Sequence, residues 1–175
     1  RVGLTDRLRG GDPELLEKAS ALRERARTVR QSAEAAGIGV LAWNDRRFPA
    51  ALLAIGDAPP VLWYRGTPDV LHAPAVAIVG SRAASAVALA TATRLAADLA
   101  GRGVIIVSGL ARGVDSAAHR GALGAGRTIA VLGSGVDRVY PPEHAALARE
   151  IADAGAVVSE YPPGTPPLAF HFPLR

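Results

Sequence analysis

VIIVSGLARGVDSAAH, residues 104–119, is the segment from which the rest of this chain is most readily interpreted. Residues 104–108 are apolar or small, which predicts a buried parallel strand, and Gly109 ends it. Arg112 follows in the turn, and a helix is expected from about Val114. A junction of strand, glycine turn and helix N-terminus directs backbone N–H groups and the positive end of the helix dipole toward one edge of the sheet. Because a guanidinium is added here, we expect the ligand to be an anion, in the first place a phosphate.

The same alternation continues through the second half of the chain. Apolar segments predict strands at residues 75–80, 104–108, 128–132 and 156–159, and helical patterns separate them at 85–102, 114–124 and 142–154. Shorter apolar segments upstream predict strands at 38–43 and 61–64 and a short helix at 52–55. Apolar strands that alternate with helices in this way predict an α/β fold, with a Rossmann-like, doubly wound, mainly parallel sheet.

Residues 1–36 have a different character. Asp12 and Pro13 predict the start of a helix, and a loose helical period with many charges follows until Gly37. Arginines and glutamates alternate along this helix, so we interpret them as a solvated face rather than a nucleic-acid contact. We therefore expect a helical segment at 1–36 and a Rossmann-like domain at 37–175.

Composition limits the class of protein. The chain has 175 residues, 49% of them hydrophobic, which is enough for one sizeable core. No apolar run approaches the ~20 residues of a membrane span and no signal segment opens the sequence, so we expect a cytoplasmic protein without membrane contact. The absence of cysteine excludes disulfides, thiolate catalysis and cysteine-bound zinc. Net charge is +4 and Lys18 is the one lysine, so the cationic side chains are almost all arginines, whose forked donors suit phosphate.

Small and basic residues gather where the expected strands end. In open parallel sheets the ligand lies beyond the carboxyl ends of the strands. Glycine permits close approach of the backbone, serine offers a hydroxyl donor, and arginine adds charge. The strand ends with this composition predict a phosphate-binding edge made of Gly80, Ser81, Arg82, Ser108, Gly109, Arg112, Gly133, Ser134 and Gly135.

Common nucleotide and metal motifs are incomplete. Gly133 and Gly135 form G-x-G, but Arg138 stands in the place of the third glycine of a dinucleotide fingerprint. No P-loop motif occurs, and the histidines are scattered without an H-x-x-x-H pair. We therefore expect no cofactor and no metal.

An acid–base or nucleophilic set can also be considered, because Ser108, Asp115, His119 and Glu160 all fall near one edge of the expected sheet. We favour a structural interpretation. Asp115 then caps its helix together with Ser116, and His119, one turn later, supports the turn by hydrogen bonding. On this interpretation the chain has no catalytic residues and is not an enzyme.

Several long motifs resemble those of the DprA/Smf family of bacterial DNA-processing proteins. They occur in the family's order and spacing, and the resemblance extends over residues 38–175. The motifs are VAIVGSR at 76–82, SGLARGVDSAAH at 108–119, TIAVLGSGVDRVYP at 128–141, VVSEYPPGTPP at 157–167 and FHFPLR at 170–175.

The resemblance implies an extended Rossmann domain that binds single-stranded DNA, protects incoming strands during natural transformation and loads the recombinase RecA onto them. It also implies a homodimer formed through this domain. The family's DNA pocket falls on the glycine and serine turns described above and on Arg175. Two features depart from the family: its members usually continue past FPxR with Asn-Arg and further strands, and His144 stands where Asn is common. The resemblance further implies that residues 1–36 hold a remnant of the family's helical N-terminal domain.

Two further possibilities remain open for the site. Tyr140, Tyr161, Phe170 and Phe172 offer faces for base stacking, although packing against the sheet edge is the simpler role for each ring. Similar sheets also support LOG-type nucleotide phosphoribohydrolases, and residues 162–165, PPGT, are similar to part of their P-G-G-x-G-T turn. The glutamate that such an enzyme needs in the following helix is missing. A LOG-type enzyme or another nucleotide-binding Rossmann protein is therefore the alternative, and single-stranded DNA is the ligand that the resemblance to the DprA/Smf family implies.

Overall fold

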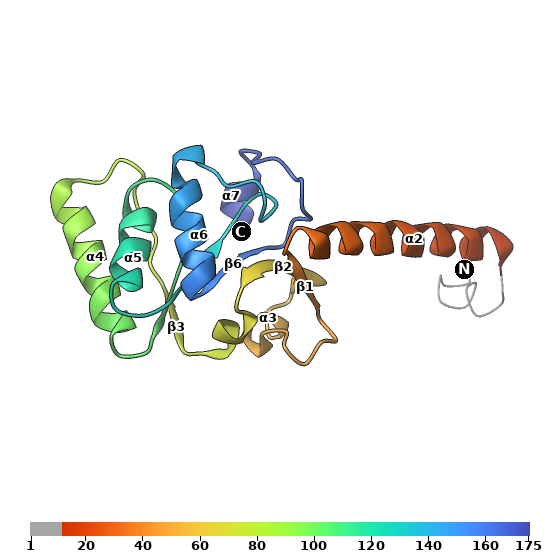
Figure 1. The fold of residues 1–175 in the computed structure, drawn as a ribbon, viewed down its shortest axis with the longest axis horizontal. Helices are drawn as coiled ribbons and strands as arrows, with labels where there is room; N and C mark the ends of the chain where they lie inside the picture. Colours follow the sequence, from red (N-terminus) through yellow and green to blue (C-terminus); the bar gives the residue numbers. More distant parts are fainter. Residues whose placement is uncertain (1–11) are drawn as a thin grey trace. The chain divides into compact units, whose positions relative to one another are not determined.

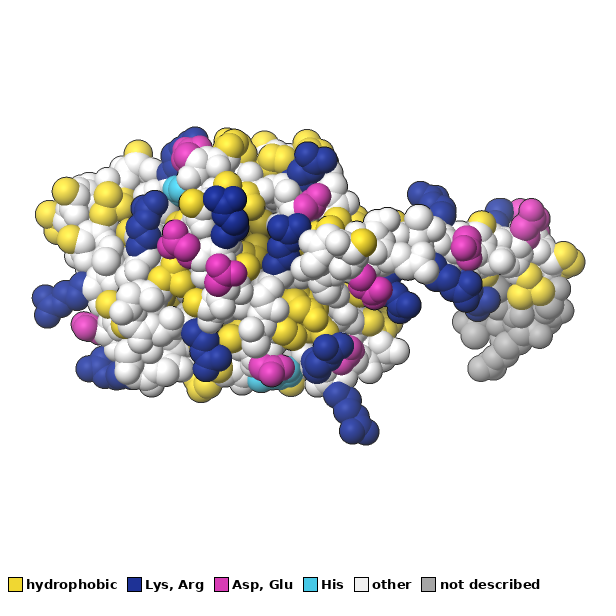
Figure 2. Space-filling view, viewed as in Figure 1, with side chains coloured by type: hydrophobic (Ala, Val, Ile, Leu, Met, Phe, Trp, Pro, Cys, Tyr) yellow, Lys and Arg dark blue, Asp and Glu magenta, His cyan; other side chains and the backbone are white. Residues whose placement is uncertain are grey.

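The structure, a computed structural model, describes residues 12–175 and divides into two compact units, Arg1–Gly37 and Ile38–Arg175. In the first, the expected helix is confirmed as α2, Pro13–Ala35; residues 1–11 of the expected helical segment lie outside the described part. The Asp12 carboxylate accepts hydrogen bonds from the amides of Glu14 and Leu15 and so caps the helix. Figure 2 shows cationic and acidic side chains interspersed along α2, and Lys18 pairs with Glu14 across one turn. The helix therefore presents the solvated, mixed-charge face that its sequence predicts.

The second unit contains a mixed sheet of six strands in the order β1-β2-β6-β5-β4-β3 (Figure 1). β3 to β6 are parallel, whereas β2 runs antiparallel to both β1 and β6. The Rossmann-like class is thereby confirmed. The strands span Gly39–Ala42 (β1), Val61–Gly66 (β2), Ala75–Ala77 (β3), Ile105–Ser108 (β4), Thr128–Val131 (β5) and Ala156–Ser159 (β6).

The crossover helices are α4 (Ala86–Ala100), α5 (Val114–Leu123) and α6 (Ala145–Ala154), which lie side by side in Figure 1. Because β3 to β6 follow one another across the sheet in chain order, right-handed crossovers place all of these helices on the same face. A doubly wound sheet would carry helices on both faces. In the part of the chain described, the opposite face is covered instead by short elements, α3 (Ala50–Leu53) and η1 (Pro68–His72).

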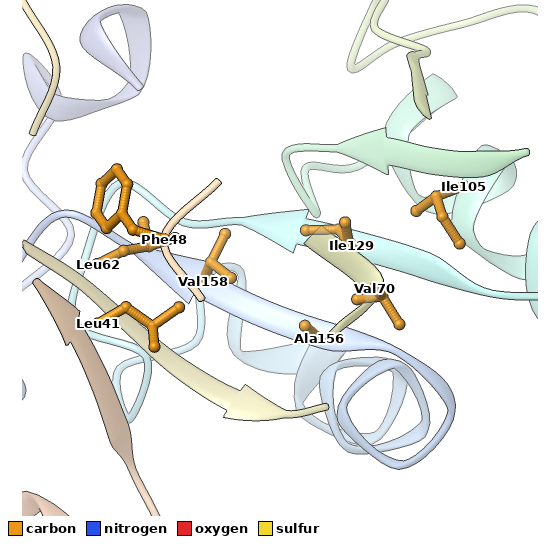
Figure 3. Packing of buried hydrophobic residues seen from close by; sticks show 8 residues of the cluster. All are labelled: Leu41, Phe48, Leu62, Val70, Ile105, Ile129, Ala156 and Val158. Atoms are coloured by element: carbon orange, nitrogen blue, oxygen red, sulfur yellow. The ribbon is translucent and has the colours of Figure 1, made fainter. Parts of the chain in front are cut away.

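Successive residues of the strands point to opposite faces of the sheet and belong to two separate hydrophobic clusters. Ile105 belongs to the cluster beneath Phe48 and Val70, shown in Figure 3, whereas Ile106 packs on the helix face with Ala96 and its neighbours. On the helix face the buried residues are mostly alanines, so α4 and α5 approach closely. A Cβ at Gly121 would collide with the backbone carbonyl of Thr93 on α4, which explains why α5 has a glycine in its interior.

His119 is the largest polar side chain among the residues the structure describes as fully buried, and it joins α5 to the sheet. Its Nδ1 lies 2.8 Å from the Thr128 hydroxyl, which itself donates to the carbonyl of Ile106 at 2.6 Å. Because the hydroxyl proton of Thr128 is used in the bond to Ile106, Nδ1–H of the neutral His119 ring is the donor in the bond to Thr128. His119 therefore links α5 to the start of β5, a contact that the sequence did not predict.

Burial, and after it the nearby His144, lowers the pKa of His119 from 6.5 to about 3. Protonating this ring would place a charge in an apolar interior, which the native state resists.

Among residues 12–175 none of the helices combines the length and the apolar character needed to cross a bilayer.

Replacing Gly121 by Ala should lower the free energy of unfolding by about 1–3 kcal/mol, because the added methyl forces α4 and α5 apart. Gly124→Ala is the matched control. It lies at the end of the same helix with a right-handed backbone, and its Cβ would meet only Gly121 and Arg120 carbonyls at 3.6 and 3.9 Å. Urea denaturation of both variants measures the difference; equal stabilities would contradict the close helix contact.

Acidification should destabilise the protein partly through His119. Its native pKa is depressed, so the unfolded chain binds the proton first, and stability present above pH 6.5 is lost as the pH falls toward 3. Between pH 6.5 and 5 this amounts to about 2 kcal/mol. In His119→Gln the fall in unfolding free energy over this interval should be smaller by that amount, whereas the exposed His72→Gln should keep the full fall. An unchanged pH dependence in His119→Gln would refute the depressed pKa.

Candidate nucleic-acid interface

The turn after β5 and the C-terminal helical turn α7, His171–Leu174, meet at the carboxyl edge of the sheet. Nδ1 of His171 donates to the carbonyl of Gly133 at 3.0 Å. A Cβ at Gly133 would lie 3.0 Å from the Phe172 ring, so a side chain there would crowd this contact. The contact brings Phe172 and Arg175, which are distant in sequence from the strand-end turns, to the predicted phosphate edge.

Two guanidinium groups contact the ring of Phe172. Cζ of Arg82 lies 5.4 Å from the ring centroid and Cζ of Arg175 lies 5.3 Å from it. The groups are close enough to interact: burial, opposed by Asp115 and reinforced by the charge of Arg82, lowers the pKa of Arg175. Within residues 12–175 Arg82 forms no ion pair with an acidic side chain. An anion bound between these cations would relieve their repulsion.

A cavity of about 400 Å³ opens beside these arginines. Its polar lining includes Arg82, Arg175 and the buried Asp115, and its apolar wall is formed by Phe172 and the strand-end valines Val79, Val107 and Val131. A smaller depression next to it is lined by Arg82, Arg112, Tyr140 and Arg175. Cations above an apolar wall suit a ligand that carries both negative charge and flat apolar surface.

Arg112 is present at this edge but is already paired. Its Nε and Nη2 both lie 2.6 Å from Oε1 of Glu143, in an ion pair whose side chains are 54% and 51% exposed. The hydrogen bond to Glu143 raises the pKa of Arg112. Sequence reasoning placed Arg112 correctly at the turn and missed Glu143, which lies 31 residues away along the chain. A phosphate that binds Arg112 must compete with this carboxylate.

The backbone amides of the turn after β4 point into the protein. Oδ2 of Asp115 accepts hydrogen bonds from the amides of Gly109 at 3.2 Å and Ala111 at 3.3 Å. The first amide of α5, that of Val114, donates to the carbonyl of Ser81 at 3.2 Å. The expected helix cap by Asp115 is wrong, because Gly113 occupies the cap position without a side-chain bond and the carboxylate is used by the preceding turn. The arginines, rather than these amides, are the donors left for an anion.

Several of the predicted hydroxyl and glycine contacts are buried. The hydroxyl of Ser108 donates to the carbonyl of Ile78 and that of Ser134 to the carbonyl of Arg138, each at 2.6 Å. Ser134 is 1% exposed because α7 and the 162–165 segment cover its turn. Gly80 and Ser81 remain exposed beside Arg82. The turn after β3 is therefore exposed at this edge, whereas the serine hydroxyls of the next two turns are bonded inside the protein.

The predicted stacking residues differ in what covers them. Tyr161 is stacked on His171 with centroids 3.9 Å apart, so this face of its ring is occupied. Phe172 is tilted against Tyr140 at 5.5 Å. Tyr140 is 38% exposed and Phe170 63%, so these rings have surface that a base could reach.

The alternative catalytic set is not assembled in the described residues. Ser108 bonds to Ile78, Asp115 to the turn amides and His119 to Thr128, and no hydrogen bond links one of these side chains to another. His144, at the position where the family commonly has Asn, donates through Nδ1 to the carbonyl of Leu110 at 2.8 Å. Leu110 has a left-handed backbone with φ of 59°, so His144 helps to hold the strained turn before Arg112.

Known proteins share this architecture. The DNA processing protein DprA of Streptococcus pneumoniae is 46% identical to this chain over 132 residues, which are 75% of this chain and 46% of the relative. The protein Smf of Escherichia coli is 45% identical to it over 73% of this chain and 35% of the relative. The X-ray structure of the S. pneumoniae protein matches with a TM-score of 0.75 and 38% identity, covering 89% of this chain and 56% of the other.

A second solved structure is that of DNA processing protein A from Helicobacter pylori, described for its single-stranded DNA binding mode. It has a TM-score of 0.70 and 32% identity, and covers 77% of this chain and 60% of the other. The present chain spans less than half the length of the curated relatives named above. The model of the DNA recombination-mediator protein A family matches residues 39–175, and the chain therefore belongs to that family.

Proposed function

We propose that the edge formed by Arg82, Arg175 and Phe172 binds single-stranded DNA. The observation that carries this proposal is the pair of guanidinium groups on one aromatic ring, one of them without an acidic partner in the described chain. The H. pylori relative, described as binding single-stranded DNA, supports the choice of ligand. Phosphates lie between the arginines, with the exposed Gly80 and Ser81 allowing the strand to approach.

Bases then stack on the rings that have open surface, Tyr140 and Phe170, each contributing about 1–3 kcal/mol. Contacts to phosphate carry no sequence information, so binding is independent of sequence. Cations and aromatic faces bind a strand without altering it, and the protein acts as a binding protein without chemistry of its own.

The wider role that we propose follows the family resemblance. The protein protects incoming single strands in natural transformation and recombination and loads RecA onto them. It works in the cytoplasm as a homodimer, with residues 37–175 as the DNA-binding domain and residues 1–36 as a helical segment.

Arg82→Ala should weaken binding of a fluorescently labelled oligo-dT by about 10-fold or more, because a charged hydrogen bond to phosphate is lost. The slope of log affinity against log salt should also become shallower by about 0.7, the value for one phosphate on a single strand. Fluorescence anisotropy at several salt concentrations measures both quantities. Arg94→Ala, which removes an exposed arginine of α4, is the control and should change neither.

An unlabelled duplex should compete poorly, since bases paired in a duplex cannot stack on Tyr140 or Phe170. If the folded protein fails to bind the single strand at low salt, or if Arg82→Ala and Arg94→Ala weaken binding equally, the edge is not the DNA site.

Glu143→Gln should tighten binding about two- to fivefold, because it releases Arg112 from an ion pair that is exposed to solvent and therefore weak. The same titration with Glu150→Gln, an exposed glutamate of α6, controls for the general loss of one negative charge. In an Arg112→Ala background the Glu143 effect should shrink to that of the control. Equal effects of both glutamates would show that Arg112 is not a phosphate ligand.

A further inference from the structure

Asp115 is a buried charge at the edge of the proposed DNA site. Its side chain is 6% exposed, and the single oxygen Oδ2 receives the amides of Gly109 and Ala111 and lies 3.8 Å from Nη2 of Arg175. The carboxylate lines the same cavity as Arg82, Arg175 and Phe172. Oδ2 of Asp115 thus links the turn after β4 to the guanidinium of Arg175, the residue that follows the C-terminal helical turn.

Gly109 makes this junction possible. A Cβ at this position would collide with the Arg175 guanidinium, so Arg175 lies directly over the bare backbone of the turn. The backbone of Gly109 is not in the left-handed region, so the missing side chain matters here for space: any Cβ would displace the guanidinium from this position. The Arg175 side chain is only 15% exposed, and without these contacts its long flexible stem would have many other orientations.

We propose that Asp115 is the positioning residue of the DNA site, which holds the Arg175 guanidinium over Gly109 so that it faces the phosphate bound by Arg82. This inference rests on the proposed function, since it concerns the same edge. Asp115 itself repels the phosphate, and its contribution to binding is made through Arg175. Removing it should therefore weaken binding only when Arg175 is present.

A double-mutant cycle on the full chain tests this proposal with the labelled oligo-dT titration. Asp115→Asn, which keeps an oxygen acceptor for the turn amides, should weaken binding about fivefold. In an Arg175→Ala background the same substitution should leave affinity unchanged within twofold or raise it, because only the repulsion is removed. Equal weakening in both backgrounds would mean that Asp115 acts on the fold alone, and would overturn the proposal.

Gly109→Ala tests the same arrangement without altering Asp115, and serves if Asp115→Asn does not fold. The added methyl displaces the guanidinium, so binding should weaken when Arg175 is present and should not change in Arg175→Ala, where the space is free. Thermal unfolding of each variant checks the fold. Absence of binding by the wild-type chain would refute the proposed function and this inference together, whereas wild-type binding with additive substitutions would refute the inference only.

Discussion

The hydrogen bond from His171 to the carbonyl of Gly133 fixes the geometry on which the candidate site depends. It attaches the C-terminal helical turn to the end of β5, where the Phe172 ring contacts two arginines from distant parts of the chain. Stacking of Tyr161 on His171 covers the same histidine from another side. The rigidity of the site therefore depends on the contact between this short C-terminal segment and the glycine turn after β5.

The arginines at this edge differ in how closely each is paired with a carboxylate. Arg112 has a close carboxylate partner in Glu143, Arg175 has a more distant one in Asp115, and Arg82 has none within the described chain. Each carboxylate offsets the repulsion between neighbouring guanidinium groups in the unliganded protein. The arrangement keeps several cations within reach of one ligand while leaving the apolar wall of the cavity intact.

Much of the architecture could be predicted from the sequence because parallel strands buried on both faces leave short apolar runs. The runs that became β4, β5 and β6 were placed almost to the residue, and the residues after them were correctly expected at one edge. The position of β2 between β1 and β6, antiparallel to both, was not foreseen, because strand order depends on contacts between distant segments. The one-sided placement of the crossover helices follows from that order.

The site itself was harder to predict, for a related reason. Strand-end position identified Arg82 and Arg112, but whether a side chain is open to a ligand depends on what lies across from it. Ser134 is buried beneath α7. The Asp115 carboxylate accepts hydrogen bonds from amides of the preceding turn instead of capping its helix. Local propensity favours the cap, but the buried amide of Gly109 and the partly buried amide of Ala111 need an acceptor, and this requirement outweighs the cap.

The composition of the edge has one consequence for the conditions under which it can hold a ligand. Its cations are guanidinium groups, which remain protonated throughout the pH range in which proteins are stable. Lysines or histidines in their place would lose charge in alkaline or mildly acidic surroundings. Salt dissolved around the protein should therefore be the main solution condition that weakens the binding of an anion at this edge.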